Sequence, residues 1–344
     1  MPPAIYLDQE DSVEQLSLSQ GNWKSTLIKS VVSVGALVII FWKIGIGSVI
    51  ERCAGLSMGW VLAAVGCILG SIAVSAWKWQ ICAKSLDLPH GFWQLIRYYF
   101  IGFFFNNFLP SSVGGDVVRV WKLGASPVDN MPGAAASVVG ERLVALFTPT
   151  ALLGIAFCSL PTVTSKVAVW LAVLVPMIAA GALAVILRNP KLGEKTMQGA
   201  AGTQFGSVKE WTITAARQMG AFLRKPKVLI QVVLLTAFFQ IWVAGVNYCL
   251  LRALDVRIGL GEALVYSCVA LAVSMLPVTI AGHGMREVAY WYFFGLAGVA
   301  KADAVSTSLL FAILVALVTL PGALFFVLDK RVASTKVNTT EKDD

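Results

Sequence analysis

The sequence predicts an all-α, polytopic membrane protein with about six spanning helices and two opposed re-entrant hairpins that form an inverted repeat. Composition, long apolar runs and loop charge lead to this prediction. Of the 344 residues, 57% are hydrophobic and 13% are charged, and the mean hydropathy is +0.76. Soluble domains carry about 25% charged residues, so this chain has too little polar surface to face water on all sides.

Long apolar runs supply the expected spanning helices. Ser30–Ile50 contains a single charge, Lys43, and five later runs contain none. Each run approaches or exceeds the ~18 apolar residues that mark a spanning helix. One such run could be a core helix of a soluble protein, but six could not. The five uncharged runs are Gly55–Trp77, Leu143–Ser165, Val167–Leu187, Val228–Leu251 and Ala304–Leu328.

The ends of the chain are polar, which places one membrane domain over residues 25–331. Residues 1–24 are acidic at first and lack the basic start of a cleaved signal peptide, so we expect the first apolar run to remain as a helix. Residues 332–344 are rich in Lys, Thr and Asp, a composition typical of disorder.

Loop charge predicts the orientation. The net charge is +8 and the pI is about 9.2, but the bases lie mainly between apolar runs, so we expect contact with anionic lipid and no nucleic-acid partner. Loop 188–227 holds eight bases against two acids and should face the cytoplasm, with an interfacial helix over 200–223. Lys330-Arg331 and the Lys78/Lys84/Arg97 cluster place the C-terminus and the second loop on the same side.

This orientation constrains two further segments. Residues 92–122 must enter and leave from the cytoplasmic side, and residues 260–299 must enter and leave from the outer side. Each segment has a Leu-Pro and Gly-rich break near its midpoint. We therefore expect two re-entrant hairpins of opposite orientation in the cytoplasmic membrane, with eight full spans as the main alternative.

The two breaks share a spacing. In both, a glycine follows the proline by five residues and an arginine follows it by nine. Two such matches in hairpins of opposite orientation indicate an inverted repeat, which is common among transporters. The shared positions are Pro110, Gly115 and Arg119 in the first break and Pro277, Gly282 and Arg286 in the second.

Breaks of this kind favour anion binding. Proline and glycine interrupt the helix, and the freed backbone groups are tolerated only beside protein or water. Short helices should begin at about Asp116 and Met285, and their N-terminal N–H groups, with the nearby arginines, would suit a phosphate. A structural kink whose arginine reaches a lipid headgroup is the alternative.

Other polar residues near the breaks extend the candidate site. The amides of Asn106-Asn107 should face a cavity or cap the broken backbone. Glu141-Arg142 are the sole charges of an apolar helix, and could be functional or form ion pairs. His283 could titrate or be a hydrogen-bonding strut, and Glu287 could neutralise its neighbour. The candidate substrate-binding residues are Asn106, Asn107, Pro110, Gly114, Gly115, Asp116, Arg119, Glu141, Arg142, Pro277, Gly282, His283, Gly284, Arg286 and Glu287.

Enzyme and metal motifs are missing from the sequence. The six cysteines are scattered without a CxxC pair, only two histidines occur, and there is no P-loop, HExxH or GxSxG motif. We therefore expect no metal, no cofactor, no disulfide framework and no catalytic residues.

At the two breaks the sequence resembles the flippase-like family defined by the transmembrane region of lysylphosphatidylglycerol synthase. The likeness is carried by Asn107–Arg119, the Glu141-Arg142 pair and Leu276–Glu287, and it covers roughly residues 25–330. The resemblance implies translocation of aminoacylated phospholipids or lipid-linked sugars. Some members are fused to transferase domains. This chain has none after its last helix, so we expect a stand-alone member without aminoacylation activity.

These observations together predict a lipid translocase. Its expected partner is a membrane phospholipid or a polyprenyl-phosphate-linked lipid, and a separate lipid-modifying transferase could act beside it. Two alternatives stay open: a secondary transporter of a small soluble anion, and an accessory subunit of a lipid-modifying enzyme.

Overall fold

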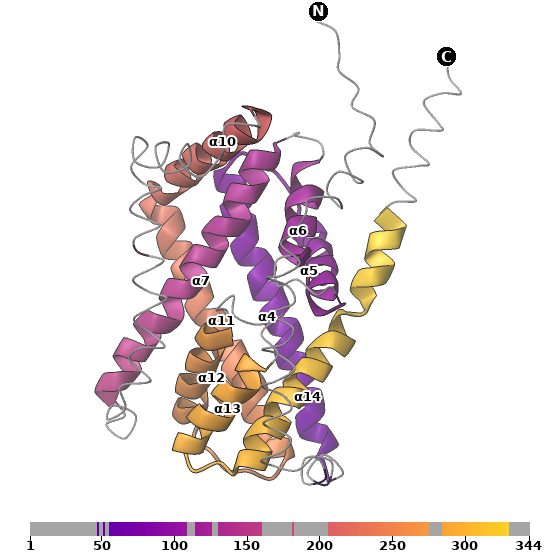
Figure 1. Ribbon diagram of the computed structural model, residues 1–344, viewed down its shortest axis with the longest axis vertical. Coiled ribbons are helices and arrows are strands. Elements are labelled where there is room, and N and C mark those ends of the chain that lie inside the picture. Colours follow the sequence, from indigo (N-terminus) through magenta and orange to yellow (C-terminus); the bar gives the residue numbers. More distant parts are fainter. Residues whose placement is uncertain are drawn as a thin grey trace, which may run out of the picture.

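A computed structural model describes residues 47, 51, 55–108, 114–125, 130–159, 181, 206–274 and 284–329. Within these ranges the chain is helical and contains no strand, which confirms the predicted all-α class (Figure 1). The helices are α4 Met58–Ser85, α5 Phe92–Phe108, α6 Gly114–Gly124, α7 Met131–Ser159, α10 Gly206–Leu223, α11 Pro226–Ala253, α12 Leu260–Ser274, α13 Met285–Leu296 and α14 Lys301–Thr319. A turn at Leu320 precedes Pro321, and the helix then continues to Asp329.

The described helices form two similar halves. Helices α4 to α7 contain 28, 17, 11 and 29 residues, and α11 to α13 contain 28, 15 and 12 residues before the 29-residue span Lys301–Asp329. Each half therefore has the order long, short, short, long. In Figure 1, α5 and α6 lie toward the end that carries α10, and α12 and α13 lie toward the other end. The two short-helix pairs thus have the predicted opposite orientations.

The short helices are consistent with re-entrant hairpins. At 1.5 Å per residue, α6 and α13 are about 16 and 18 Å long, well short of a hydrocarbon core of about 30 Å. Within each pair the two helices contact each other, α5 with α6 and α12 with α13. For the two segments that contain these helices, the lengths favour hairpins over full spans.

The long helices agree with the predicted apolar runs. By length and composition, α4, α11 and Lys301–Asp329 could each cross a membrane. Helix α7 covers most of the predicted Leu143–Ser165 run but begins earlier, at Met131. The predicted Ser30–Ile50 and Val167–Leu187 spans lie outside the described residues, apart from isolated positions 47 and 181.

The same backbone turn ends the first long helix of each half. Asp87 follows α4 and Asp255 follows α11, and each has a φ of 59°. After α4, the N–H of Leu88 donates to the carbonyl of Ala83 at 3.0 Å, and a matching bond follows α11. Asp is among the residues that tolerate this left-handed conformation, which satisfies carbonyls at a helix end. The shared turn directs the chain from a long helix into a hairpin.

Glycines allow the two helices of the first hairpin to approach each other. A Cβ atom placed on Gly115 of α6 would lie 1.9 Å from the carbonyl oxygen of Gly102 on α5. A Cβ on Gly102 would lie 2.8 Å from the side chain of Arg119. Only glycine leaves room for this contact, which positions Arg119 inside the protein.

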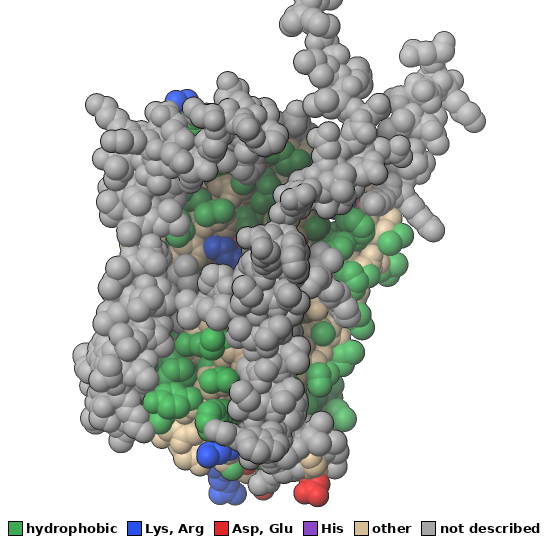
Figure 2. Space-filling model, in the orientation of Figure 1, with side chains coloured by type: hydrophobic (Ala, Val, Ile, Leu, Met, Phe, Trp, Pro, Cys, Tyr) green, Lys and Arg blue, Asp and Glu red, His purple; other side chains and the backbone are tan. Residues whose placement is uncertain are grey.

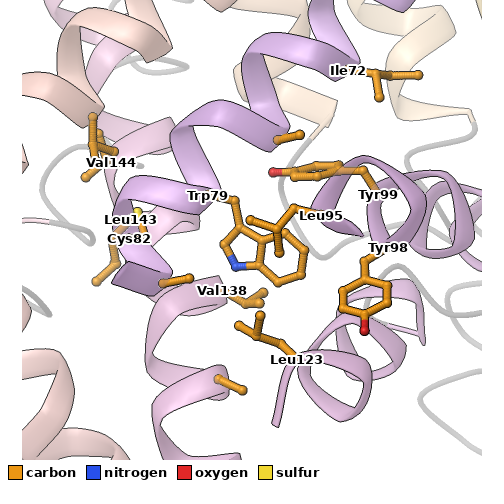
Figure 3. Close-up of a cluster of buried hydrophobic side chains, with 14 of the residues drawn as sticks. Ile72, Trp79, Cys82, Leu95, Tyr98, Tyr99, Leu123, Val138, Leu143 and Val144 are labelled. Carbon is orange, nitrogen blue, oxygen red and sulfur yellow. The ribbon is translucent and has the colours of Figure 1, made fainter. Parts of the chain in front are cut away.

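The core of the first half surrounds Trp79 of α4. This indole is fully buried, and Figure 3 shows it near Tyr99, Leu95 and Val138, which come from α5 and α7. Its Nε1 donates to the Ser137 hydroxyl at 3.1 Å. The helices around the first hairpin are therefore packed side chain against side chain.

Helix α10 lies across one end of the bundle, at a steep angle to the long helices (Figure 1). It packs on α7 through buried side chains that include Met219 and Phe222. Of the interfacial helix predicted over 200–223, residues 206–223 are described and are helical, and its position at the membrane surface stays a prediction.

Candidate functional site

Two amides fix the inner end of the first hairpin. The Asn106 Oδ1 accepts a hydrogen bond from the N–H of Gly115 at 2.9 Å, which satisfies a free donor in the first turn of α6. The predicted capping role is thus confirmed for Asn106. The Asn107 Nδ2 donates to Thr319 Oγ1 at 3.1 Å, next to the turn in α14. The hairpin is tied both to its own second helix and to the last helix.

Arg119 lies at the centre of a buried ion cluster. Its Nη2 donates to Glu141 Oε2 at 2.6 Å, and its Nη1 donates to Asp116 Oδ1 at 3.2 Å. The guanidinium lies over the rings of both Trp79 and Tyr99, at 4.2 and 4.0 Å from their centroids. Stacking on aromatic faces suits this planar, weakly hydrated cation. Arg119 is therefore held on several sides, and 5% of its side chain is exposed.

Glu141 has three partners and completes the cluster. Besides pairing with Arg119, Glu141 accepts a hydrogen bond from the Tyr99 hydroxyl and forms an ion pair with Lys78 Nζ at 3.1 Å. The expectation that Lys78 belongs to a cytoplasmic loop is wrong, because α4 continues to Ser85 and Lys78 is buried. A buried carboxylate with several charged partners is far more favourable than an unpaired one.

Arg142 forms the edge of the same cluster. Its Nε and Nη2 atoms contact the two carboxylate oxygens of Asp116 at 2.8 to 3.1 Å. The side chain of Arg142 is nevertheless 43% exposed. The pairing of Glu141-Arg142 with Asp116 and Arg119, predicted as one possibility, is confirmed.

The depth of Arg142 makes its exposure costly. It lies eleven residues into α7, about 16 Å along the helix axis. A charge at the bilayer centre costs roughly 2.5–3.5 kcal/mol on insertion scales. In Figure 2 the described surface between the two ends of the bundle is mainly hydrophobic, and both basic and acidic side chains lie at its lower end. An exposed cation at this depth needs water or an anionic ligand beside it.

A second, smaller cluster lies in the second hairpin. Arg286 Nη2 pairs with Glu287 Oε1 at 3.0 Å, and its Nε donates to Ser308 Oγ at 3.1 Å. Glu287 Oε2 accepts the N–H of Gly284 at 2.6 Å, so this carboxylate also caps α13. Gly284 has a φ of 86°, which side chains disfavour. The predicted neutralisation of Arg286 by its neighbour is confirmed.

The two clusters occupy equivalent places in the two halves. Arg119 bonds the residue 22 positions later, Glu141, and Arg286 bonds the residue 22 positions later, Ser308. In each half an arginine from the second hairpin helix thus contacts the following long helix. The halves differ in the next position, where Arg142 stands in the first and Leu309 in the second.

Other predicted site residues are placed less fully. Gly114 begins α6. The two breaks themselves lie outside the described residues, so nothing tests the roles of Pro110, Pro277, Gly282 and His283. In the described ranges, no three His, Cys, Asp or Glu side chains are grouped so that they could hold a metal ion.

Sequence reasoning missed several side chains of these clusters. Lys78 and Trp79 follow directly after an apolar run, and continuing that helix for two more turns would have included them. Tyr99 lies in an aromatic run and Ser308 in an apolar helix, where neither residue type is unusual. A further buried network, in which Tyr290 donates to Asn247 at 2.7 Å and Asn247 donates to Ser267 at 2.9 Å, also had no sequence motif.

The fold and the clusters define the class of protein: a polytopic helical membrane protein made of two opposed halves, each with a paired arginine where its hairpin meets a long helix. Residues 26–322 match the family described as the lysylphosphatidylglycerol synthase transmembrane region, and the chain belongs to that family.

Two archaeal relatives share most of the chain. A UPF0104 membrane protein of Pyrococcus horikoshii is 25% identical over 301 residues, which cover 81% of this chain and 90% of the relative. A UPF0104 membrane protein of Methanothermobacter thermautotrophicus is 21% identical over 302 residues, covering 80% and 85% respectively. The similarity therefore spans nearly the whole membrane domain.

Proposed function

We propose that the protein is a lipid translocase that moves an anionic, phosphate-bearing lipid across the cytoplasmic membrane without changing it chemically. The observation that carries the proposal is Arg142, whose side chain is 43% exposed although it lies eleven residues into the apolar helix α7. Membership of a family named for a lipid synthase's membrane region agrees with a role in lipid handling. The lipid would be a phospholipid or a polyprenyl-phosphate-linked lipid.

The arrangement suggests how a headgroup could pass. The phosphate would contact Arg142, while the acyl chains would stay among apolar side chains or in the bilayer. Because the hairpins enter from opposite ends, each half would open the site to a different side of the membrane. Small movements of one half against the other would expose the site to the two sides in turn. Asn107 and Thr319 join the first hairpin to α14, so these two elements would move together.

The proposed orientation follows from loop charge. The end that carries α10 and the basic loop 188–227 would face the cytoplasm. A lipid-modifying transferase, if one supplies the substrate, would act at that surface.

The proposal is tested by replacing Arg142 in sealed vesicles. The protein is reconstituted with a trace of acyl-labelled phosphatidylglycerol, and translocation is followed by the fraction of label that an external reductant bleaches. Because Arg142 supplies the exposed cation, we expect Arg142→Gln to slow translocation at least about tenfold, the ratio that corresponds to about 1.4 kcal/mol.

The matched control is Arg252→Gln. Arg252 lies in the last turn of α11, 5.6 Å from the Trp60 ring and outside both clusters. This substitution removes the same charge from the bundle and should leave the rate unchanged. A wild-type rate for Arg142→Gln, in protein that elutes and melts like the wild type, would disprove the proposal.

A further inference from the structure

The charges of the first cluster do not balance. Lys78, Arg119 and Arg142 supply three positive charges, and their carboxylate partners are Asp116 and Glu141. Glu141 is shared by Lys78 and Arg119, and Asp116 is shared by Arg119 and Arg142. Counted over the residues that the structure describes, the cluster therefore carries one uncompensated positive charge.

Arg142 is the most exposed of the three cations, so we place the uncompensated charge there. Lys78 and Arg119 are nearly fully buried, with 4% and 5% of their side chains exposed, against 43% for Arg142. Asp116 engages the Nε and Nη2 atoms of Arg142, which leaves the Nη1 amino group outside this pair. A ligand would meet a partly exposed side chain whose guanidinium is held in place by Asp116 through Nε and Nη2.

The ion pairs in the described part of the second half show no such surplus. There Arg286 pairs with Glu287, and Leu309 stands at the position of Arg142. The two halves share their helix order and their arginine-to-long-helix bond, but not this charge. The difference confines the anion site to the first half.

We infer that the site at Arg142 selects a phosphodiester monoanion over a phosphate monoester or a diphosphate. This inference rests on the proposed lipid translocase function and names its substrate class. A phosphodiester carries one negative charge, which matches the surplus, whereas a phosphate monoester carries about −1.5 to −2 at pH 7. A dianion would leave the cluster with a net negative charge in an apolar bundle, where uncompensated charge is strongly disfavoured.

The phosphodiester could belong to a lipid headgroup or to a soluble molecule. Both would present the same single charge to Arg142, but only a lipid would also bury acyl chains among the apolar helices. A binding experiment separates the two sources by comparing probes with and without these chains.

Binding is measured as the ligand-induced rise in melting temperature of the purified full-length protein in neutral detergent at pH 8. The probes are dioctanoyl phosphatidylglycerol with one charge, dioctanoyl phosphatidic acid with nearly two, dioctanoylglycerol with none, and dimethyl phosphate with one charge and no acyl chain. We expect the wild type to bind the monoanionic lipid about tenfold more tightly than either other lipid. Dimethyl phosphate should bind weakly, and equal binding of dimethyl phosphate would assign the site to a soluble anion.

Two variants change the charge of the cluster but retain Arg142. Asp116→Asn adds one positive charge and should shift the preference to the dianionic lipid. Lys78→Met removes one positive charge and should abolish the preference for an anion. The shifts go in opposite directions, so either variant alone is informative if the other fails to fold, and Arg252→Gln should behave like the wild type.

The inference fails if the wild type binds the monoanionic and dianionic lipids equally, or if neither variant shifts the preference. Because binding is measured without transport, these outcomes differ from failure of the proposed function. If the protein prefers the monoanion but does not move lipid, the site at Arg142 stands and the translocase proposal is wrong.

Discussion

At the scale of single residues, the first cluster depends on carboxylates shared among cations. Glu141 serves Lys78, Arg119 and the Tyr99 hydroxyl, so its loss leaves two buried cations short of a partner. Removing one member of a buried ion pair typically costs about 3–5 kcal/mol. The ion cluster is therefore a strong constraint on how α4, α6 and α7 pack.

We predict that Glu141→Gln is among the most destabilising single changes in this cluster. The amide keeps the shape of the side chain but removes its charge, so a loss of about 3–5 kcal/mol is expected from the unpaired cations. The measurement is the free energy of unfolding in mixed micelles with denaturant. Lys78→Met combined with Glu141→Gln should recover part of the loss, because one cation leaves with the carboxylate. Equal stability of the wild type and Glu141→Gln would contradict this account.

A second prediction concerns Tyr99, which both stacks on Arg119 and donates to Glu141. Tyr99→Phe keeps the ring and removes the donor, so the expected loss is about 1.5–3 kcal/mol, typical of a hydrogen bond to a charged group. Tyr98→Phe is the neighbouring control, because that hydroxyl accepts a hydrogen bond from the neutral amide of Gln94. If both changes cost the same, the bond to Glu141 contributes nothing beyond an ordinary hydrogen bond.

At the scale of elements, the first hairpin depends on two glycines in contact. A methyl group on Gly115 would overlap the backbone of α5 at Gly102, and backbone cannot move aside as a flexible side chain can. Helix α5 would move away from α6, and Arg119 would lose its contacts with the rings of Trp79 and Tyr99.

We therefore predict that Gly115→Ala destabilises the protein by about 1–3 kcal/mol, the usual cost of overpacking, and impairs translocation. The control is Gly66→Ala in α4, where a Cβ would have no atom within 4 Å. Because alanine is the better helix former, Gly66→Ala should be neutral or slightly stabilising. The measurement is the melting temperature of each variant. An unchanged value for Gly115→Ala would mean that α5 and α6 are not in close contact at Gly102.

Particular residues show what sequence could predict at this scale. The paired prolines and glycines predicted both hairpins, because these residue types interrupt a helix, and the paired arginines linked the two segments. The Glu141-Arg142 pair was identified because charges are rare in apolar helices. Lys78 was misassigned, because an apolar run stops at the first charge although the helix does not. Trp79, Tyr99 and Ser308 are ordinary residues of membrane helices, and only the packing of α4, α5 and α14 brings them to the arginines.

At the scale of the whole molecule, the two halves repeat a helix order but differ in charge. Under the proposed function, the repeat would give access from two sides, and the surplus charge near Arg142 would give one half an anion site. Sequence spacing predicted the repeat, but it did not show that Arg119 is enclosed while Arg142 is open. That difference depends on how α6 and α7 face each other.

The orientation prediction also belongs to the whole molecule. Single cysteines are introduced at Arg217, on the α10 side, and at Arg257, after α11, in a variant without native cysteines that still translocates lipid. An impermeant thiol reagent applied to intact cells should label the second position, and inverted vesicles should expose the first. If the reagent labelled both positions from the same side, they would lie on one side of the membrane, which would contradict two opposed halves.

The most direct test of the central claim is transport by the wild-type protein in sealed vesicles. Vesicles with and without the protein receive labelled phosphatidylglycerol in one leaflet and labelled phosphate in the external solution, and movement of both is followed in the same preparation. We predict that the protein accelerates transfer of the lipid between leaflets and leaves phosphate uptake at the protein-free rate. Folded protein that leaves the lipid rate unchanged, or that carries phosphate instead, would contradict lipid translocation.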